Sequence, residues 1–251
     1  MPTLFTGNNT IRLPIVESTN AYAQDLARQL KVPEGTVVIT DNQTLGRGQR
    51  GNSWFCEPGK NLTFSLILYP PDLAADNQFV LTQLVSLAIA DYVKSEYSKP
   101  DEVKIKWPND IYVGNKKIAG ILIENSLRGN LLSNSIIGIG LNINQLDFGE
   151  LKATSLALLT AKNFDLNASL EKVCSAIEAR YLQWINKKQL ILNAEYQKNL
   201  YLIQEPASFE IENRKVDGKI IGVNKSGKLL LSLIPNFEVL ELGIKEIKFL
   251  K

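Results

Sequence analysis

Short apolar runs rich in β-branched residues recur along the first part of the chain and predict a sheet. The clearest is TVVIT at residues 36–40, where Val, Ile and Thr favour a buried strand. The run at 11–16 contains Pro14, which cannot donate a ladder hydrogen bond and therefore predicts an edge strand. A Gly-Asn turn joins the runs 111–113 and 117–124 as a hairpin. Further strands are predicted at residues 61–68, 102–107 and 135–143.

Apolar residues at helical spacing predict helices between and after these strands. The first helix follows Ser18 and Thr19, and either hydroxyl can cap it. The second, at residues 78–97, is predicted to be the longest and to have one apolar side. Residues 145–154 have few core positions and predict a loop. Two amphipathic helices are predicted after it, at residues 169–189 and 191–200.

From about Glu205 onward the pattern changes to short apolar runs separated by turns, one of them predicted at Asp217-Gly218. This change predicts a small all-β module that begins near Pro206, so the chain divides into residues 1–204 and 205–251. Its strands are predicted at residues 207–212, 219–223, 229–233, 237–241 and 246–249.

Composition narrows the chemistry that this chain can perform. Its 251 residues can bury a sizeable core, and its formal net charge of +2 does not indicate a nucleic-acid partner. The sequence contains no histidine, which excludes Ser-His-Asp and Cys-His catalysis and histidine-containing zinc sites. Chemistry must therefore use Lys, Arg, carboxylates, backbone dipoles or a metal ion that comes with a substrate.

The sequence also suggests a compartment. No apolar run approaches the roughly 20 residues that a membrane-spanning helix needs, which predicts no membrane partner. The first residues lack the basic start and apolar core of a signal peptide. Cys56 and Cys174 have no CxxC spacing, so we expect reduced thiols in a cytoplasmic protein.

A glycine-rich loop follows the strand at 36–40 and is the strongest candidate for a ligand site. Residues 46–54 read GRGQRGNSW, and glycines at every second or third position prevent a regular helix or strand. Open backbone N–H groups beside Arg47 and Arg50 suit a carboxylate or a phosphate. The loop alone leaves a second interpretation open, which is a solvated basic turn.

Four segments occur together in this sequence: VESTN, DNQTLGRGQRGNSW, KWPNDIYVGNKKIAGILIEN and GIGLNIN. Their order and spacing resemble those of the biotin protein ligases, over residues 11–205. The resemblance implies an α+β fold with a mixed, largely antiparallel sheet packed with helices, as in class II synthetases and biotin–lipoyl ligases. It also implies that the C-terminal module is a small SH3-like β-barrel.

The resemblance implies an ATP-dependent activity in two steps. Biotin and ATP form biotinyl-5′-adenylate and pyrophosphate, and biotin then passes to a lysine of a biotin carboxyl carrier protein domain. Mg²⁺ is expected through the ATP phosphates, with no metal-ligating residue assigned. Two alternatives remain, namely a lipoate–protein ligase of the same fold and a non-catalytic biotin sensor or adaptor.

Matching the family motifs residue by residue implies a binding site for each substrate. Arg47 and Lys117 match the residues that neutralise charge during catalysis, and Trp54 matches a tryptophan that stacks on adenine, although it could instead anchor the loop in the core. The implied biotin-binding residues are Ser18, Thr19, Asn20, Gln43, Gly46, Arg47, Gly48, Gln49, Lys117 and Gly120. The implied ATP- or adenylate-binding residues are Arg50, Asn52, Trp54, Lys106, Asn109, Asp110 and Asn142.

The sequence departs from the family in two respects. Gln49 and Asn52 stand where arginines are frequent, so we expect the adenylate to be held less tightly than in arginine-rich relatives. The VESTN segment begins about 16 residues from the first residue, which predicts a ligase without the DNA-binding repressor domain and hence no DNA partner. The family includes sheet-edge homodimers, so a homodimer remains open here.

Overall fold

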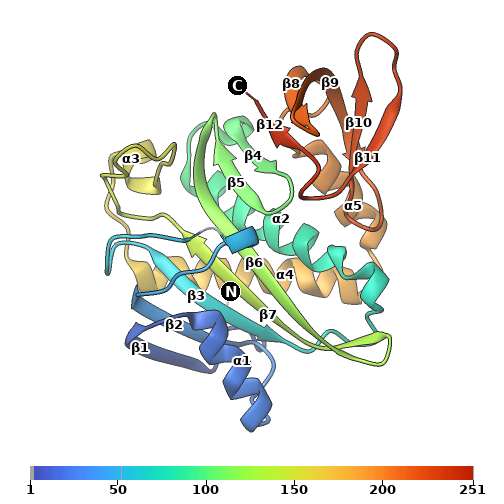
Figure 1. Ribbon diagram of the computed structural model, residues 1–251. Coiled ribbons are helices and arrows are strands. Elements are labelled where there is room, and N and C mark those ends of the chain that lie inside the picture. Colours follow the sequence, from blue (N-terminus) through green and yellow to red (C-terminus); the bar gives the residue numbers. More distant parts are fainter. Residues whose placement is uncertain (1–2, 52, 251) are drawn as a thin grey trace.

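A computed structural model describes residues 3–51 and 53–250, apart from the side chain of Arg50. The chain forms a seven-stranded sheet, a five-stranded sheet and the helices that cover the larger sheet (Figure 1). The strand order in the larger sheet is β1-β2-β3-β7-β6-β5-β4. β1 and β2 pair in parallel, and the other ladders in this sheet are antiparallel. The predicted mixed, largely antiparallel sheet is therefore confirmed.

The predicted strands of the larger sheet all occur. β1 lies at the edge of the sheet, as the proline inside it predicts, and the hairpin of β5 and β6 turns at Gly114. β6 continues past the predicted end because it pairs with β7 along most of its length. The bounds are Thr10–Val16 (β1), Thr36–Gln43 (β2), Leu62–Leu68 (β3), Val103–Lys106 (β4), Asp110–Val113 (β5), Lys116–Arg128 (β6) and Leu131–Leu141 (β7).

Alternate residues of the central strands face two different cores. On one face Val38, Ile67 and Ile136 pack with Ala23 of α1. On the other face their neighbours share one core with α2, and α4 and α5 pack against α2. The helices are Thr19–Gln29 (α1), Phe79–Glu96 (α2), Leu156–Thr160 (α3), Leu166–Ile185 (α4) and Gln189–Lys198 (α5).

Two predictions about the helices need correction and one is resolved. α4, with 20 residues, is longer than α2, with 18. α2 is buried on nearly all sides rather than on one, because it lies between the sheet and the helices α4 and α5 (Figure 1). Ser18 rather than Thr19 caps α1, and its hydroxyl accepts a hydrogen bond from the backbone N–H of Ala21.

The C-terminal strands form a five-stranded antiparallel sheet in the order β11-β10-β9-β8-β12. The predicted turn at Asp217-Gly218 is wrong, because both residues lie inside β9. The chain turns instead at Glu212 and Asn213, which have φ values of 50° and 62°. A side chain at Gly218 would press on the carbonyl of Ser232, which explains a glycine within the strand. The bounds are Pro206–Ile211 (β8), Arg214–Val223 (β9), Leu229–Leu233 (β10), Val239–Leu242 (β11) and Lys248–Phe249 (β12).

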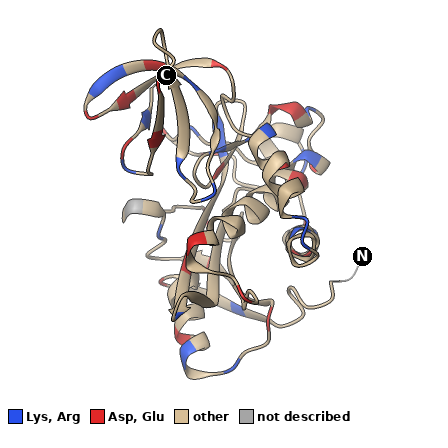
Figure 2. Cartoon of the chain, turned by 90° about the vertical axis from the view of Figure 1, so that its right-hand side faces the viewer, with Lys and Arg blue, Asp and Glu red and all other residues tan. Residues whose placement is uncertain are grey.

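The smaller sheet packs directly on the larger part of the molecule. Phe209, Ile220 and Leu231 belong to the same apolar cluster as the buried residues of α2. The indole Nε1 of Trp107 donates a hydrogen bond to the carbonyl of Gly227 at 2.9 Å. Basic and acidic residues are interspersed along both parts in the view of Figure 2. In the described ranges, no helix is long and apolar enough to cross a membrane, and both cysteines are free.

The N-terminal segment is held by a single buried carboxylate. Glu178 of α4 accepts hydrogen bonds from the backbone N–H groups of Leu4, Phe5 and Thr6 at 2.7, 2.9 and 3.0 Å. Burial raises the pKa of Glu178, but these bonds to the charged form outweigh it, and the net shift is downward.

Replacing Glu178 by glutamine is expected to lower the free energy of unfolding at pH 7 by about 1–3 kcal/mol, because a neutral amide oxygen binds three N–H groups less strongly. Because the pKa of Glu178 is lower in the folded protein than in the unfolded chain, its carboxylate stabilises the folded state fully above the unfolded-state pKa of about 4.3. This stabilisation is lost as the pH falls through the folded-state pKa. Urea unfolding across pH 3–7 measures this. The difference between the two proteins should shrink at the acidic end, and a constant difference would contradict the account.

Candidate active site

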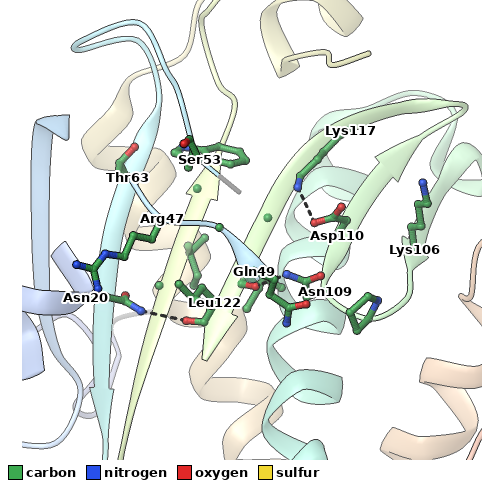
Figure 3. A pocket seen from close by; sticks show the side chains of 18 of the residues that line it. Asn20, Arg47, Gln49, Ser53, Thr63, Lys106, Asn109, Asp110, Lys117 and Leu122 are labelled. Atoms are coloured by element: carbon green, nitrogen blue, oxygen red, sulfur yellow. Dashed lines mark hydrogen bonds and ion pairs between the residues drawn. The ribbon is translucent and has the colours of Figure 1, made fainter. Parts of the chain in front are cut away.

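A cavity of about 390 Å³ lies on the face of the larger sheet that carries α1. The N-terminus of α1, the end of β2, the glycine-rich loop and strands β3, β6 and β7 surround it, together with the end of β12. Figure 3 shows several of its side chains pointing toward one another. The predicted site residues that line it are Ser18, Thr19, Asn20, Gln43, Arg47, Gly48, Gln49, Trp54, Lys106, Asn109, Asp110, Lys117 and Gly120.

One end of the cavity is lined by uncharged polar side chains that belong to a hydrogen-bond network. Gln43 Oε1 accepts from the backbone N–H of Thr19 at 2.9 Å. The hydroxyl of Ser65 lies 2.8 Å from Thr19 Oγ1 and 2.6 Å from Asn20 Oδ1. The amide of Asn20 donates to Glu124 Oε2 at 2.7 Å. These bonds fix the orientation of each polar group, so this end is preorganised for a small polar ligand.

Glycines at alternate positions on the floor of the cavity let side chains approach the sheet. A Cβ on Gly138 would collide with Asn20, and one on Gly140 would collide with the indole of Trp54. Gly120 lies directly opposite Gly140 in the β6–β7 ladder, and its Cβ would lie 3.2 Å from the same indole. The glycines at 138 and 140 in β7 therefore leave room for two side chains, Asn20 and Trp54.

Trp54 therefore rests on a shelf of two glycines inside the cavity. Its Nε1 is buried and has no hydrogen-bond partner among the described residues. Its backbone N–H donates to the carbonyl of Gly46 at 2.9 Å, and a Cβ on Gly46 would collide with the carbonyl of Trp54. Gly46 closes the base of the loop and does not line the cavity, whereas the indole does.

The opposite end of the cavity is charged. Lys117 Nζ forms an ion pair with Asp110 Oδ1 at 2.6 Å (Figure 3). The same atom lies 5.5 Å from the centre of the Trp54 ring. Among the described residues, the lining contains four basic side chains, Arg47, Lys106, Lys117 and Lys248, and one carboxylate, Asp110. In Figure 3, Arg47 lies on the side of Asn20, whereas Lys106 and Lys117 lie on the side of Asp110. An excess of positive charge over a polar, partly enclosed surface suits an anionic ligand.

Lys106 lies between two aromatic rings. Its Nζ is 4.7 Å from the centre of the Tyr112 ring and 5.0 Å from that of Phe249. Burial lowers the pKa of Lys106, Asp110 opposes this effect and Lys117 adds to it. Burial, followed by the charge of Asp110, raises the pKa of Tyr112 to about 12. The Lys106 ammonium is thus a partly desolvated cation beside the cavity.

Besides Gly46, three more predicted residues either do not line the cavity or cannot be assigned to it. Asn142 is buried and lies outside the lining, because its amide donates to the carbonyl of Thr154 at 3.0 Å and holds the following loop. Asn52 and the side chain of Arg50 lie outside the described residues. The glycine-rich loop also contains one turn of 3₁₀ helix at Gln49–Gly51, where no regular structure is predicted.

Several lining residues were missed by the motif argument. Thr63, which lines the cavity, and Ser65 are two positions apart in the apolar strand β3, so both face the same side of the sheet. Such a pair of polar residues could have indicated a polar site on that face. Nothing comparable marks the C-terminal contributors, which are Ile244, Ile247, Lys248 and Phe249.

Gln145 ties together the two loops that flank the charged end. Its Oε1 accepts from the backbone N–H of Glu57 at 3.0 Å and from the amide of Asn61 at 2.6 Å. Further along the same loop, the backbone of Lys117 pairs with Lys152 and Thr154. The loop at 145–154 therefore connects the segment that follows the glycine-rich loop to the strand that carries Lys117.

Replacing Gln145 by leucine is expected to lower the free energy of unfolding by about 2 kcal/mol, because two buried N–H groups lose their acceptor. Urea unfolding measures the change. Gln189→Leu, at an exposed position on α5, serves as the control and should leave stability nearly unchanged. Equal effects of the two variants would contradict the role of Gln145 as a tie.

Comparison with known proteins agrees with this geometry. The pattern of the biotin/lipoate A/B protein ligase family matches residues 13–142. The chain is 32% identical over 230 residues to the bifunctional ligase/repressor BirA of Bacillus spizizenii, covering 90% of this chain and 70% of that protein. It is 28% identical over 233 residues to the biotin–[acetyl-CoA-carboxylase] ligase of Mycobacterium tuberculosis, covering 90% of this chain and 85% of that protein.

The fold has a close match among solved structures. The biotin protein ligase from Aquifex aeolicus, in complex with biotin and ATP, superposes with a TM-score of 0.79 at 27% identity. The match covers 97% of this chain and 100% of that chain. The fold, the cavity and these similarities together show that the chain belongs to the biotin/lipoate A/B protein ligase family.

Proposed function

We propose that this protein is an ATP-dependent biotin protein ligase. It activates biotin to biotinyl-5′-AMP with release of pyrophosphate and transfers biotin to a lysine of a biotin carboxyl carrier protein domain. The observation that carries the proposal is one cavity with a neutral polar network at one end and excess positive charge at the other. The names of the similar ligases and the biotin and ATP complex of the Aquifex aeolicus ligase support the same activity.

The neutral end suits the ureido head of biotin, which both donates and accepts hydrogen bonds. Ser18, Thr19, Asn20 and Gln43 supply hydroxyl and amide groups for it. The glycine-rich loop, with Gly46, Arg47, Gly48 and Gln49, would wrap the carboxylate end. Lys117 and Gly120 would complete this part of the site.

The charged end suits ATP and the adenylate. Trp54 would offer a stacking face for adenine, and Lys106, Asn109 and Asp110 would face the phosphates and ribose. Similar roles for Arg50 and Asn52 remain predictions. Asn142 would act by holding the loop behind Lys117 rather than by touching the nucleotide.

The first step is attack of a biotin carboxylate oxygen on the α-phosphorus of ATP, with pyrophosphate leaving. Two anions must meet, so Arg47 and Lys117 lower the barrier by neutralising charge as the new bond forms. In the second step, a neutral lysine amine of the carrier domain attacks the acyl carbon and AMP leaves. Closure of the loop over the adenylate would exclude water and so prevent its hydrolysis.

Mg²⁺ belongs to the proposal as the counter-ion of the ATP phosphates. The described part of the chain contains no group of three or more Asp, Glu or Cys side chains that could hold a metal ion. The phosphates would therefore supply most of its ligands, as is common for nucleotide-bound Mg²⁺.

The domain division at residues 1–204 and 205–251 is part of the same proposal. It is supported by the separate five-stranded sheet that begins with β8 at Pro206. Short, antiparallel strands support an SH3-like architecture for this module. A cytoplasmic location, the lack of a DNA partner and a homodimer remain predictions, and DNA-binding and light-scattering measurements would test the last two.

The direct test is incubation with biotin, Mg·ATP and a biotin carboxyl carrier domain, followed by mass spectrometry of the carrier lysine. We expect one added biotinyl group that depends on ATP. Biotin should raise the melting temperature and lipoate should not, which separates this function from a lipoate ligase. Binding of biotin without adenylate formation would favour the non-catalytic sensor and overturn the proposal.

The uncharged Gln49 permits a sharper test of adenylate retention. Gln49→Arg is expected to slow adenylate release in the absence of acceptor by several-fold, because arginine adds a charge-assisted bond to an anionic ligand. Release of radiolabelled adenylate from the two proteins measures this. Equal release rates would contradict the prediction.

A further inference from the structure

Lys106 and Phe249 meet where the two parts of the molecule join beside the cavity. Lys106 is the last residue of β4 in the larger sheet, and Phe249 is the last residue of β12 in the smaller one. Both residues line the cavity. The Lys106 ammonium lies 5.0 Å from the centre of the Phe249 ring, 4.7 Å from that of Tyr112 and 3.3 Å from the Tyr112 hydroxyl.

Each ring is fixed by its own part of the molecule. Phe249 pairs with Phe209 in the β8–β12 ladder, and their rings meet edge to face at 5.4 Å. Phe209 is fully buried in the core. Tyr112 packs against Tyr201 with 5.6 Å between ring centres. The ammonium therefore occupies a slot whose two walls come from different sheets.

The residue next to Lys106 locks the same junction. Trp107 is 4% exposed, and its Nε1 donates at 2.9 Å to the carbonyl of Gly227 in the turn between β9 and β10. A Cβ on Gly227 would lie 2.6 Å from Phe79, so this turn fits closely against α2. The segment that presents Lys106 to the cavity is thus tied to the C-terminal module at two successive positions.

The slot gives the ammonium properties that a free lysine lacks. The ammonium is attracted by the Phe249 ring and donates a hydrogen bond to the Tyr112 hydroxyl, and its side chain loses the rotamers that would carry it into solvent. It has been partly desolvated in advance, which is consistent with its lowered pKa. A fixed and partly dehydrated cation binds a phosphate oxygen with less reorganisation than a mobile one.

We propose that Phe249 is a positioning residue for the nucleotide: with Tyr112 it holds the Lys106 ammonium toward the cavity, where it contacts an ATP phosphate. The charge that meets the phosphate is therefore assembled only when the C-terminal module is docked. This inference rests on the proposed function and deepens it, because it gives the C-terminal module a defined part in nucleotide binding.

The test replaces Phe249 by leucine, which keeps an apolar side chain and removes the aromatic face. The KM for ATP should rise about fivefold to tenfold, while the KM for biotin should stay within about twofold of the wild type. Phe249→Tyr restores an aromatic face and should return the KM for ATP to near the wild-type value. Phe237→Leu, at a 75% exposed position of the same module, should change neither constant.

Tyr112→Leu removes the other wall of the slot and should give the same ATP-selective change, so the inference stays testable if Phe249→Leu folds poorly. An unchanged KM for ATP in both leucine variants would overturn it. Equal rises in both KM values, or a rise in Phe237→Leu, would indicate a merely structural role and would overturn it as well.

Hydrogen exchange on the unliganded protein separates failure of this inference from failure of the proposed function. Phe249→Leu should speed amide exchange in residues 103–113, and Phe237→Leu should not. If Phe249→Leu exchanges faster than the wild type, but the wild type shows no ligase activity, the proposed function is refuted and the coupling between the two modules is supported. If the wild type is an active ligase, but Phe249→Leu changes neither the amide exchange nor the KM for ATP, only the coupling is refuted.

Discussion

Replacing Lys117 by alanine is expected to reduce the rate of adenylate formation by about 100-fold or more while leaving the protein folded. The reaction brings a carboxylate against a triphosphate, and removal of one preorganised charge costs on the order of 3 kcal/mol of transition-state stabilisation. Lys117 is 31% exposed in its side chain and paired with Asp110, so its cation is held at the charged end of the cavity. Pyrophosphate release in single-turnover experiments measures the chemical step.

The neighbouring lysine provides a matched control. Lys116 is exposed, carries the same charge and is next to Lys117 in β6, but it does not line the cavity. Lys116→Ala should keep nearly full activity, which separates the local effect of Lys117 from a change in net charge. A loss of less than about tenfold in Lys117→Ala would remove this residue from the catalytic assignment.

Asp110 makes the prediction for Lys117 more specific. The ion pair at 2.6 Å keeps the ammonium in place before a ligand arrives, at the cost of competing with an incoming anion. Asp110→Asn should therefore weaken the hold on Lys117 without removing its charge. We expect a smaller loss of rate than in Lys117→Ala, and a larger loss would point to a direct role for the carboxylate.

The strands of this fold could be predicted because their signals are local. The alternation of apolar residues and the Gly-Asn turn of the β5–β6 hairpin depend only on neighbouring positions. The error at Asp217-Gly218 shows the limit of such signals. That pair is typical of turns, but Gly218 is needed where β9 passes the carbonyl of Ser232, a partner that lies 14 residues along the chain. Local propensity cannot register such a contact.

The candidate site likewise contains residues that local sequence patterns indicate and residues that only distant contacts bring into place. Motifs carried the prediction of Arg47 and Lys117, because their spacing in the sequence is itself diagnostic. Phe249 could not be predicted, because a phenylalanine near the C-terminus is indistinguishable from an ordinary core residue until β12 is placed beside β4. Asn142 belongs to a matching motif, but its amide donates to the carbonyl of Thr154 and does not line the cavity, an orientation that sequence spacing could not predict.

Replacing Gly140 by alanine is expected to raise the KM for ATP by about tenfold, because the new methyl group would occupy the place of the Trp54 indole. Gly120 and Gly140 face each other across β6 and β7, and the absence of side chains at both creates the shelf on which the indole rests. A displaced indole could no longer present its face to adenine. Steady-state kinetics with ATP as the varied substrate measure the effect.

A double-mutant cycle decides whether the indole carries this effect. Trp54→Ala alone should raise the KM for ATP by a similar factor, since stacking on a base contributes about 1–3 kcal/mol. If the methyl group acts by displacing Trp54, then Gly140→Ala should cost little in the Trp54→Ala background, because there is no ring left to move. Additive effects would instead mean that Gly140 contacts the nucleotide directly or that alanine distorts the β3–β7–β6 ladder. Melting temperatures of the single variants separate these two causes, because only a distorted ladder lowers stability in the absence of ATP.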